Sequence, residues 1–473
     1  MSANRMELNM AQPTHALFAE DAFLPAGWRR NVLLQWDAQG ALTAVAADTQ
    51  APAGVERARG PVLPGMPNLH SHAFQRAMAG LTEYRANAVD SFWTWRDLMY
   101  RFAARITPET LASIAQWLYV EMLKAGYTSV CEFHYVHHMQ DGQRYANEAE
   151  LAQRVVDAAG ASGIGITMLP VLYQYAGFGA QPPREDQRRF INTPDSLLGL
   201  LDTLRRARPE HGALRYGVAP HSLRAVSNES LRALLNGLDA MSPGAPVHIH
   251  IAEQMAEVGA CVETEGARPV QWLFDRFDVD QRWCLVHATH IDASETTALA
   301  KSGAVAGLCL TTEANLGDGI FPAHDYLAQN GCIGVGSDSH IGVDWCAELR
   351  LFEYGQRLLR RERNVLASTD MPRVADRLFA AALDGGAQAT GRAVGALAVG
   401  QRADWIVLDA NHPSIACDVP DAWLSSVIFA EHGENVVRDV YVSGNAVVQD
   451  RVHRDQEDAY RGYKAALGEL LGR

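Results

Sequence analysis

The sequence predicts an α/β fold of the (β/α)8 TIM-barrel type, with a small β-sandwich domain built from both ends of the chain. Eight short apolar runs alternate with helix-like segments in the middle of the chain, and this alternation is typical of a parallel sheet. The two ends instead contain strand-like segments separated by Gly, Asn and Asp, which is typical of antiparallel strands and turns. The 473 residues are enough for one large barrel with an appended domain.

We expect three segments along the chain. Residues 1–60 form the N-terminal part of the β-domain, residues 61–394 form the catalytic barrel, and residues 395–473 form the C-terminal part of the β-domain with a terminal helix. The predicted strand regions of the β-domain are 31–48, 403–410 and 435–451, and the terminal helix is predicted near 455–471. The first of these regions fits two strands around a Gln39-Gly40 turn.

The eight apolar runs of the middle segment predict the barrel strands. In chain order they are 61–70, 128–134, 164–173, 214–221, 246–253, 283–290, 304–312 and 332–340. Between the first two runs, residues 107–127 fit a helix with apolar residues at helical spacing. Thr107 can cap its start, Pro108 suits its first turn, and Gly126 can end it.

Composition and charge exclude several classes of protein. The chain has 41 basic and 55 acidic residues, a formal net charge of −14, and no basic block, so we expect neither a nucleic-acid nor a membrane partner. There is no signal-peptide pattern and no apolar run near the ~20 residues of a membrane span. Seven scattered cysteines without a C-x-x-C pair argue against a disulfide framework. We therefore expect a cytoplasmic globular protein.

Metal-binding and titratable residues stand at the ends of four predicted strands. They are His70, His72, His250, Glu253, His287 and Asp338. Side chains two residues apart in a strand face the same side, so His70 and His72 can bind one ion together. The strand ends of such barrels meet at the active site. Neutral imidazoles with a carboxylate suit Zn²⁺, and Fe²⁺ or Mn²⁺ are also possible.

The order of these motifs resembles the amidohydrolase superfamily of metal-dependent hydrolases. The matching segments read PGMPNLHSH, HIHIAE, VHATH and GSDSH, and residues 391–409 resemble the family's return into the β-domain. The resemblance covers nearly the whole chain. It implies one Zn²⁺ per subunit, with the ligands His70, His72, His250 and Asp338. It also implies that Glu253, His287 and Asp338 are catalytic.

The scarcity of lysine favours one branch of this superfamily. Its two-metal members resemble one another in a carbamylated lysine that ends the fourth strand and bridges the ions. The run 214–221 contains no lysine, and the three lysines of the chain are Lys124, Lys301 and Lys464. The single-metal deaminase branch is therefore favoured, and its H-x-x-E signature is present from His250 to Glu253.

In that branch, a metal ion lowers the pKa of a water molecule toward neutrality, and the hydroxide attacks an sp² carbon that bears nitrogen. Glu253 then donates a proton to the nitrogen, which leaves as ammonia. His287 and Asp338 can each take the proton of the water, and the sequence does not decide between them.

Segments 70–80 and 91–100 resemble the branch that deiminates linear formimino compounds in histidine degradation. The resemblance implies conversion of N-formimino-L-glutamate and water to N-formyl-L-glutamate and ammonia, by a homodimer. The substrate contacts that it implies are Gln75, Arg96, Tyr135, His221 and Arg224. A small substrate with two carboxylates needs convergent forked donors, and arginine matches the geometry of a carboxylate.

Several alternatives stay open. The chain can be another single-metal deaminase, acting on guanine or an adenosine derivative, or a non-catalytic barrel scaffold. Gln75 can orient its loop instead, Tyr135 can be a packed lid residue, and the aromatic cluster Phe92, Trp93 and Trp95 fits core or lid packing. The insert 174–195 can be a lid or a packed surface segment.

Overall fold

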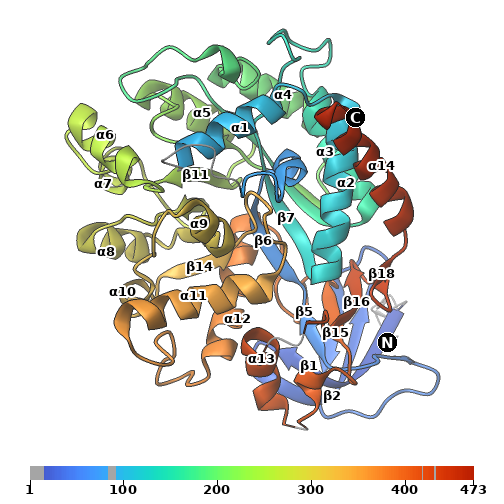
Figure 1. Cartoon of the computed structure of the whole chain (residues 1–473). Coiled ribbons are helices and arrows are strands. Elements are labelled where there is room, and N and C mark those ends of the chain that lie inside the picture. Colours follow the sequence, from blue (N-terminus) through green and yellow to red (C-terminus); the bar gives the residue numbers. More distant parts are fainter. Residues whose placement is uncertain (1–14, 84–91, 418, 431–432, 473) are drawn as a thin grey trace, which may run out of the picture.

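The computed structural model describes residues 15–83, 92–417, 419–430 and 433–472. Parallel strands surrounded by helices form the larger part of the molecule, and strands from both ends of the chain lie together beside it (Figure 1). The predicted mixture of a parallel α/β region with a terminal β-region is therefore confirmed.

The two ends of the chain share one sheet, which has nine strands among the described residues. They are β1 (His15–Leu24), β2 (Gly27–Trp36), β3 (Leu42–Ala46), β4 (Glu56–Arg57), β5 (Val62–Pro64), β15 (Trp405–Leu408), β16 (Val437–Val442), β17 (Asn445–Gln449) and β18 (Val452–His453). Strand β5 joins the two halves, because it pairs with β1 on one side and with β15 on the other. The prediction that both termini build one β-region is confirmed, and its arrangement as a sandwich stays a prediction.

The terminal sheet has its own apolar cluster. The ring of Trp405 lies 5.0 Å from that of Trp36 and 5.0 Å from that of Tyr441, so residues from both ends of the chain pack together. The predicted turn at Gly40 lies between β2 and β3, with a φ of +75°. A Cβ there would lie 2.5 Å from the Cβ of Ser443, so only glycine fits.

Each of the eight predicted runs contains a parallel strand. They are β6 (Met66–Ser71), β7 (Tyr127–His134), β8 (Gly165–Leu172), β9 (Leu214–Tyr216), β10 (Ala219–Pro220), β11 (Val247–Ile251), β12 (Trp283–His287), β13 (Val305–Leu308) and β14 (Cys332–Val335). The fourth run is split into β9 and β10, and the first run supplies both β5 and β6. Strands β6 to β10 form one sheet and β11 to β14 another. Isolated parallel bridges connect their edges, from Ser71 to Asp338 and from Val218 to Val247.

Helices follow the parallel strands and lie outside them (Figure 1). The α-helices of the described residues are α1 (Phe92–Ala103), α2 (Pro108–Ala125), α3 (Glu150–Ser162), α4 (Pro194–Ala207), α5 (Asn228–Met241), α6 (Met255–Glu265), α7 (Pro269–Arg276), α8 (Ala293–Ser302), α9 (Leu310–Leu316), α10 (Ala323–Leu327), α11 (Trp345–Arg360), α12 (Val374–Thr390), α13 (Pro420–Phe429) and α14 (Gln456–Leu471). Short 3₁₀ turns are η1 (Ala73–Met78), η2 (Glu185–Gln187) and η3 (Pro413–Ile415). Among the described helices, none combines the length and the apolar character needed to cross a membrane.

The predicted helix at 107–127 is confirmed as α2. The Thr107 side chain caps its start by accepting from the backbone N–H of Thr110, and Gly126 ends it with a φ of 98°. The predicted terminal helix is confirmed as α14, which lies along α2 (Figure 1). The ring of Trp117 on α2 lies 5.1 Å from that of Tyr460 on α14. This contact ties the C-terminal helix to the parallel α/β region.

Candidate active site

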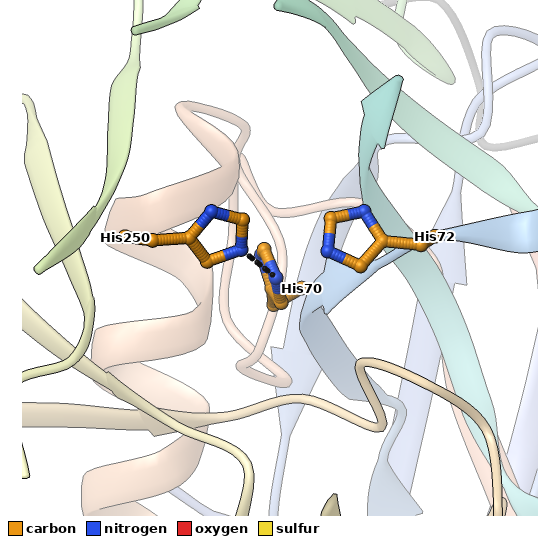
Figure 2. Close-up of side chains that lie close together, drawn as sticks. All are labelled: His70, His72 and His250. Atoms are coloured by element: carbon orange, nitrogen blue, oxygen red, sulfur yellow. Dashed lines mark hydrogen bonds between the residues drawn. The ribbon is translucent and has the colours of Figure 1, made fainter. Parts of the chain in front are cut away.

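Three histidine side chains converge at the ends of two parallel strands. His70 lies in β6, His72 directly follows it, and His250 lies in β11. Figure 2 shows the rings of His72 and His250 on either side of His70, with one nitrogen of each of these two rings directed toward the space around His70. The Nε2 atoms of His70 and His250 are 3.0 Å apart. One nitrogen of each of the three rings lies within 4.8 Å of the others, so the predicted group of histidines is brought together.

Asp338 adds a carboxylate to this cluster. Its Oδ1 lies 3.4 Å from Nε2 of His70 and 3.3 Å from Nε2 of His72. The backbone holds it there, because the N–H of Asp338 donates to the carbonyl of His70 and the N–H of His72 donates to the carbonyl of Asp338. Burial raises the pKa of Asp338, but the hydrogen bond with His70 and the surrounding histidines outweigh it and lower that pKa. The carboxylate is therefore ionised.

The four side chains fit a divalent metal ion. Nδ1 of His72 donates to the carbonyl of Phe133 at 2.8 Å, and Nδ1 of His250 donates to the carbonyl of His221 at 3.1 Å. A carbonyl only accepts, so each Nε2 carries a lone pair that faces the shared space. Burial lowers the pKa of His70 to about 3, which keeps its imidazole neutral. Ligand atoms at tetrahedral positions about 2.0–2.1 Å from Zn²⁺ lie about 3.3 Å from one another. The distances from Oδ1 of Asp338 to Nε2 of His70 and of His72, 3.4 and 3.3 Å, are close to this value.

A buried polar network lies behind the cluster. Ser71, between His70 and His72, donates its hydroxyl to Glu132 at 2.6 Å and lies 3.1 Å from Nε2 of His340. The backbone N–H of Ala73 donates to the other oxygen of Glu132 at 2.7 Å. These hydrogen bonds lower the pKa of Glu132, but burial outweighs them and raises that pKa to about 7. The network holds the two histidine-bearing positions in place, as outer partners of metal ligands generally do.

His287 stands between three carboxylates beside the cluster. Its Nε2 lies 3.8 Å from Glu253 and 3.9 Å from Asp338, and its Nδ1 lies 3.2 Å from Glu313. Burial lowers the pKa of His287, but Glu253, the hydrogen bond with Glu313 and Asp338 outweigh it and raise that pKa to about 10. Glu313 orients the ring, because it accepts from Nδ1 and directs Nε2 toward Glu253 and Asp338. The sequence analysis did not predict Glu313, and the only signal for it in the sequence is a glutamate that directly follows the seventh predicted strand, 304–312.

Glu253 is a carboxyl group that can hold a proton near neutral pH. Burial raises its pKa to about 7, although the nearby charges of His287 and Arg224 lower it.

The backbone of the site is strained at three residues, since Ala252, His287 and Asp338 all have left-handed φ values, of 51°, 68° and 47°. Left-handed backbone in non-glycine residues costs free energy and clusters at functional sites.

A cavity that is partly open to solvent lies beside these groups. His72, His250, Glu253, His287 and Asp338 line one part of it. The remaining lining includes every residue for which the family resemblance implied a substrate contact: Gln75, Arg96, Tyr135, His221 and Arg224. The structure therefore brings every predicted site residue except His70 into the lining of one cavity, and the fully buried His70 lies behind it, with its Nε2 3.0 Å from that of His250.

The two arginines reach the cavity from different elements. Arg224 follows β10 and is 8% exposed, and its Nε and Nη1 have no hydrogen-bond partner within the described residues. Burial lowers its pKa, but Glu257 and Glu253 outweigh it and raise that pKa. Arg96 lies on α1 and is half-buried, with its guanidinium carbon 4.5 Å from the ring centre of Trp93. The cavity thus offers permanent positive charge beside the histidine cluster.

Neutral polar groups complete the wall. Gln75 donates its amide to the hydroxyl of Tyr135 at 2.8 Å, and the ring of Tyr135 lies 5.0 Å from that of His72. Nδ1 of His221 lies 3.0 Å from the hydroxyl of Ser222. Gln75 and Tyr135 are both packed and in the lining, so the packing alternatives that the sequence left open are compatible with a place in the cavity wall.

The insert 174–195 lies against the cavity wall. The amide of Gln187 donates to the hydroxyl of Tyr173 at 2.9 Å and to that of Tyr100 at 3.2 Å. Both tyrosines line the cavity, and the sequence analysis missed them. On the outside, Arg184 pairs with Asp97 on α1 at 3.0 Å. The insert therefore holds the helix that carries Arg96.

Comparisons with known proteins agree with this fold. The model of the Amidohydrolase family matches residues 62–447, and the chain belongs to that family. The chain is 56% identical over 457 residues to the formimidoylglutamate deiminase of Pseudomonas aeruginosa, which covers 96% of this chain and 99% of that protein. A 5-methylthioadenosine/S-adenosylhomocysteine deaminase of Natronomonas pharaonis is 27% identical over 82% of each chain. The crystal structure of an amidohydrolase from Brucella melitensis has a TM-score of 0.89 at 45% identity, over 97% of this chain and 100% of that one.

Proposed function

We propose that this protein is a hydrolase that converts N-formimino-L-glutamate and water to N-formyl-L-glutamate and ammonia. The observation that carries the proposal is a single cavity in which the buried guanidinium of Arg224 faces the same space as the histidine cluster and Glu253. The 56% identity to a formimidoylglutamate deiminase over nearly the whole of both chains supports the same reaction.

His70, His72, His250 and Asp338 would hold one Zn²⁺ per subunit, and the same donors also suit Fe²⁺ or Mn²⁺. When bound, such an ion lowers the pKa of a water molecule toward neutrality and so supplies the nucleophile at pH 7. The neutral imidazoles and the ionised carboxylate of the cluster are the protonation states that this role needs.

Glu253, Asp338 and His287 take part in the proton transfers and the charge stabilisation of the reaction. Glu253, whose pKa burial raises to about 7, holds a proton and donates it to the nitrogen that leaves as ammonia. Asp338 accepts the proton of the water. His287, 3.9 Å away, is protonated near neutral pH because its pKa is raised to about 10, and its positive charge stabilises the reacting oxygen. Glu313 keeps the ring of His287 in the orientation that this interaction needs.

The substrate carboxylates bind to Arg224 and Arg96. Arginine offers paired N–H donors that match a carboxylate, and these bonds are stronger where water is excluded. Gln75, Tyr135 and His221 add neutral polar groups along the wall between the arginines and the cluster. In a protein with a net charge of −14, local arginines are what attracts a dicarboxylate.

The finer structural predictions belong to the same proposal. The bridges from Ser71 to Asp338 and from Val218 to Val247 support a closed (β/α)8 barrel, with domain boundaries near 60 and 394 and a terminal β-sandwich. Zinc as the metal, a cytoplasmic location, a role in histidine degradation, a homodimer, and the lack of nucleic-acid or membrane partners remain parts of the proposal, and the absence of a basic block supports the last of these.

Ammonia release by the zinc-loaded protein tests the proposal, with N-formimino-L-glutamate, guanine and adenosine as parallel substrates. We expect efficient turnover of the first compound alone. Turnover of a purine alone would favour a purine deaminase, the second candidate, which the 27% identical adenosine-derivative deaminase supports. If the metal-replete protein releases no ammonia from any of the three compounds, the assignment is overturned. Failure to retain stoichiometric metal would favour a non-catalytic scaffold.

A further inference from the structure

Glu257 holds the turn that presents Glu253. It lies in the first turn of α6 and is 2% exposed. One of its carboxylate oxygens accepts from the backbone N–H of Ala252 at 3.3 Å, and the other accepts from the N–H of Glu253 at 3.2 Å. Because Ala252 has a left-handed φ of 51°, this turn is strained and needs such support.

The same carboxylate also faces Arg224. Nη1 of Arg224 lies 3.7 Å from Oε2 of Glu257, and both side chains are buried. Nε and Nη1 of Arg224 have no hydrogen-bond partner among the described residues. Glu257 therefore attracts the guanidinium without using up its donors, so a carboxylate in the cavity can still accept from them.

We infer that Glu257 is a positioning residue that links carboxylate recognition at Arg224 to the placement of Glu253, an inference that rests on the proposed function. A guanidinium already held in direction loses less freedom when it binds an anion. The carboxylate that holds it also fixes the backbone of the proton donor, so a shift at Arg224 is transmitted to Glu253 through one side chain.

The chain contains a matched carboxylate outside the cavity. Glu353 on α11 is fully buried, and its two oxygens accept from the consecutive backbone N–H groups of Val365 and Leu366 at 2.9 and 3.0 Å. Arg357 donates to it at 2.6 Å. Glu353 thus shares the local role of Glu257, but neither it nor Arg357 lines the cavity.

A double-mutant cycle on N-formimino-L-glutamate tests the link, with zinc content and thermal stability measured for every variant. The proteins are the zinc-loaded wild type, Glu257→Gln, Arg224→Met, the double variant and Glu353→Gln. Glutamine presents an NH₂ group where one carboxylate oxygen accepted, so one of the two backbone bonds is lost. We expect Glu257→Gln to lower kcat/KM about 10- to 100-fold, through both a lower kcat and a higher KM.

In the double variant, KM should match that of Arg224→Met alone, while the loss in kcat from Glu257→Gln persists. This non-additivity in KM is the sign of coupling. Glu353→Gln should lower thermal stability and leave both constants within about twofold of the wild type. If Glu257→Gln does not fold, Glu257→Asp keeps the charge on a shorter side chain, and the same cycle is run with it.

Two results would overturn the inference alone, given an active wild type. The first is an increase in KM in the double variant equal to the product of the single effects. The second is an unchanged kcat in Glu257→Gln with its zinc retained. A wild type that releases no ammonia from this substrate would instead overturn the proposed function, and the inference with it.

Discussion

The proposed metal-binding side and the proposed substrate-binding side of the cavity are built differently. His70 and His250 lie within strands, and the backbone of Asp338 is bonded to that of His70 and His72. The arginines instead stand on a loop after β10 and on α1, which the insert holds through the contacts of Gln187 with Tyr100 and of Arg184 with Asp97. Under the proposed function, the groups that carry the reaction are held by the parallel strands, whereas those that select the substrate lie on segments that can vary without disturbing the strands.

The largest effect should come from removing a proposed metal ligand at the strand ends. His72→Ala removes one of the four ligands, so we expect a loss of activity of about 10,000-fold together with loss of bound zinc. Ammonia release and elemental analysis measure the two. The control is His248→Ala, because His248 lies in the same strand as His250 but donates to the carbonyl of Ala389. Full activity with bound zinc in His72→Ala would contradict the proposed ligand set.

Glu253→Gln should separate chemistry from metal binding on that same side. The amide cannot donate a carboxylic proton to the leaving nitrogen, so kcat should fall about 100- to 1000-fold. Zinc content should stay at the wild-type level, because Glu253 is not one of the proposed ligands. Single-turnover kinetics with elemental analysis checks this, and a variant that keeps its kcat would assign the proton to another group.

The two arginines should differ in the size of their effect. Arg224→Met leaves the substrate carboxylate without its buried partner, and we expect KM to rise about 100-fold. Arg96→Met should raise KM only about tenfold, since Arg96 is half-buried and its site is more accessible to water. Steady-state kinetics of the two variants gives the comparison. Equal increases in KM would show that the site of Arg96 on α1 is as well shielded from water as that of Arg224 on the loop after β10.

The pH dependence should be the mildest effect. Burial raises the pKa of Glu253 to about 7, and the proton donor must be protonated to act. We therefore expect kcat/KM to be highest below that pH and to fall about tenfold per unit as pH rises above it. The falling limb should be absent in Glu253→Gln, whose amide does not titrate. A limb that persists there would belong to a different group.

The buried tyrosines and the insert show where prediction from sequence ends. The helix at 107–127 was predictable because its cap, its proline and its glycine are all local signals, and each has the expected role in α2. The contact of Gln187 with Tyr100 joins residues 87 positions apart, and nothing in either segment marks the other as a partner. Glu313 likewise meets His287 across 26 positions.

The sequence by itself determined the family, the order of the strand ends and the residue types that stand there. These follow from periodicity and from short motifs, which act over a few residues along the chain. Only the tertiary structure decided that Arg224 and Glu253 share the carboxylate of Glu257, and that Arg96 comes to the cavity on a helix held by the insert. Such contacts depend on how distant segments pack, because a side chain meets its neighbours only when the whole fold has brought them together.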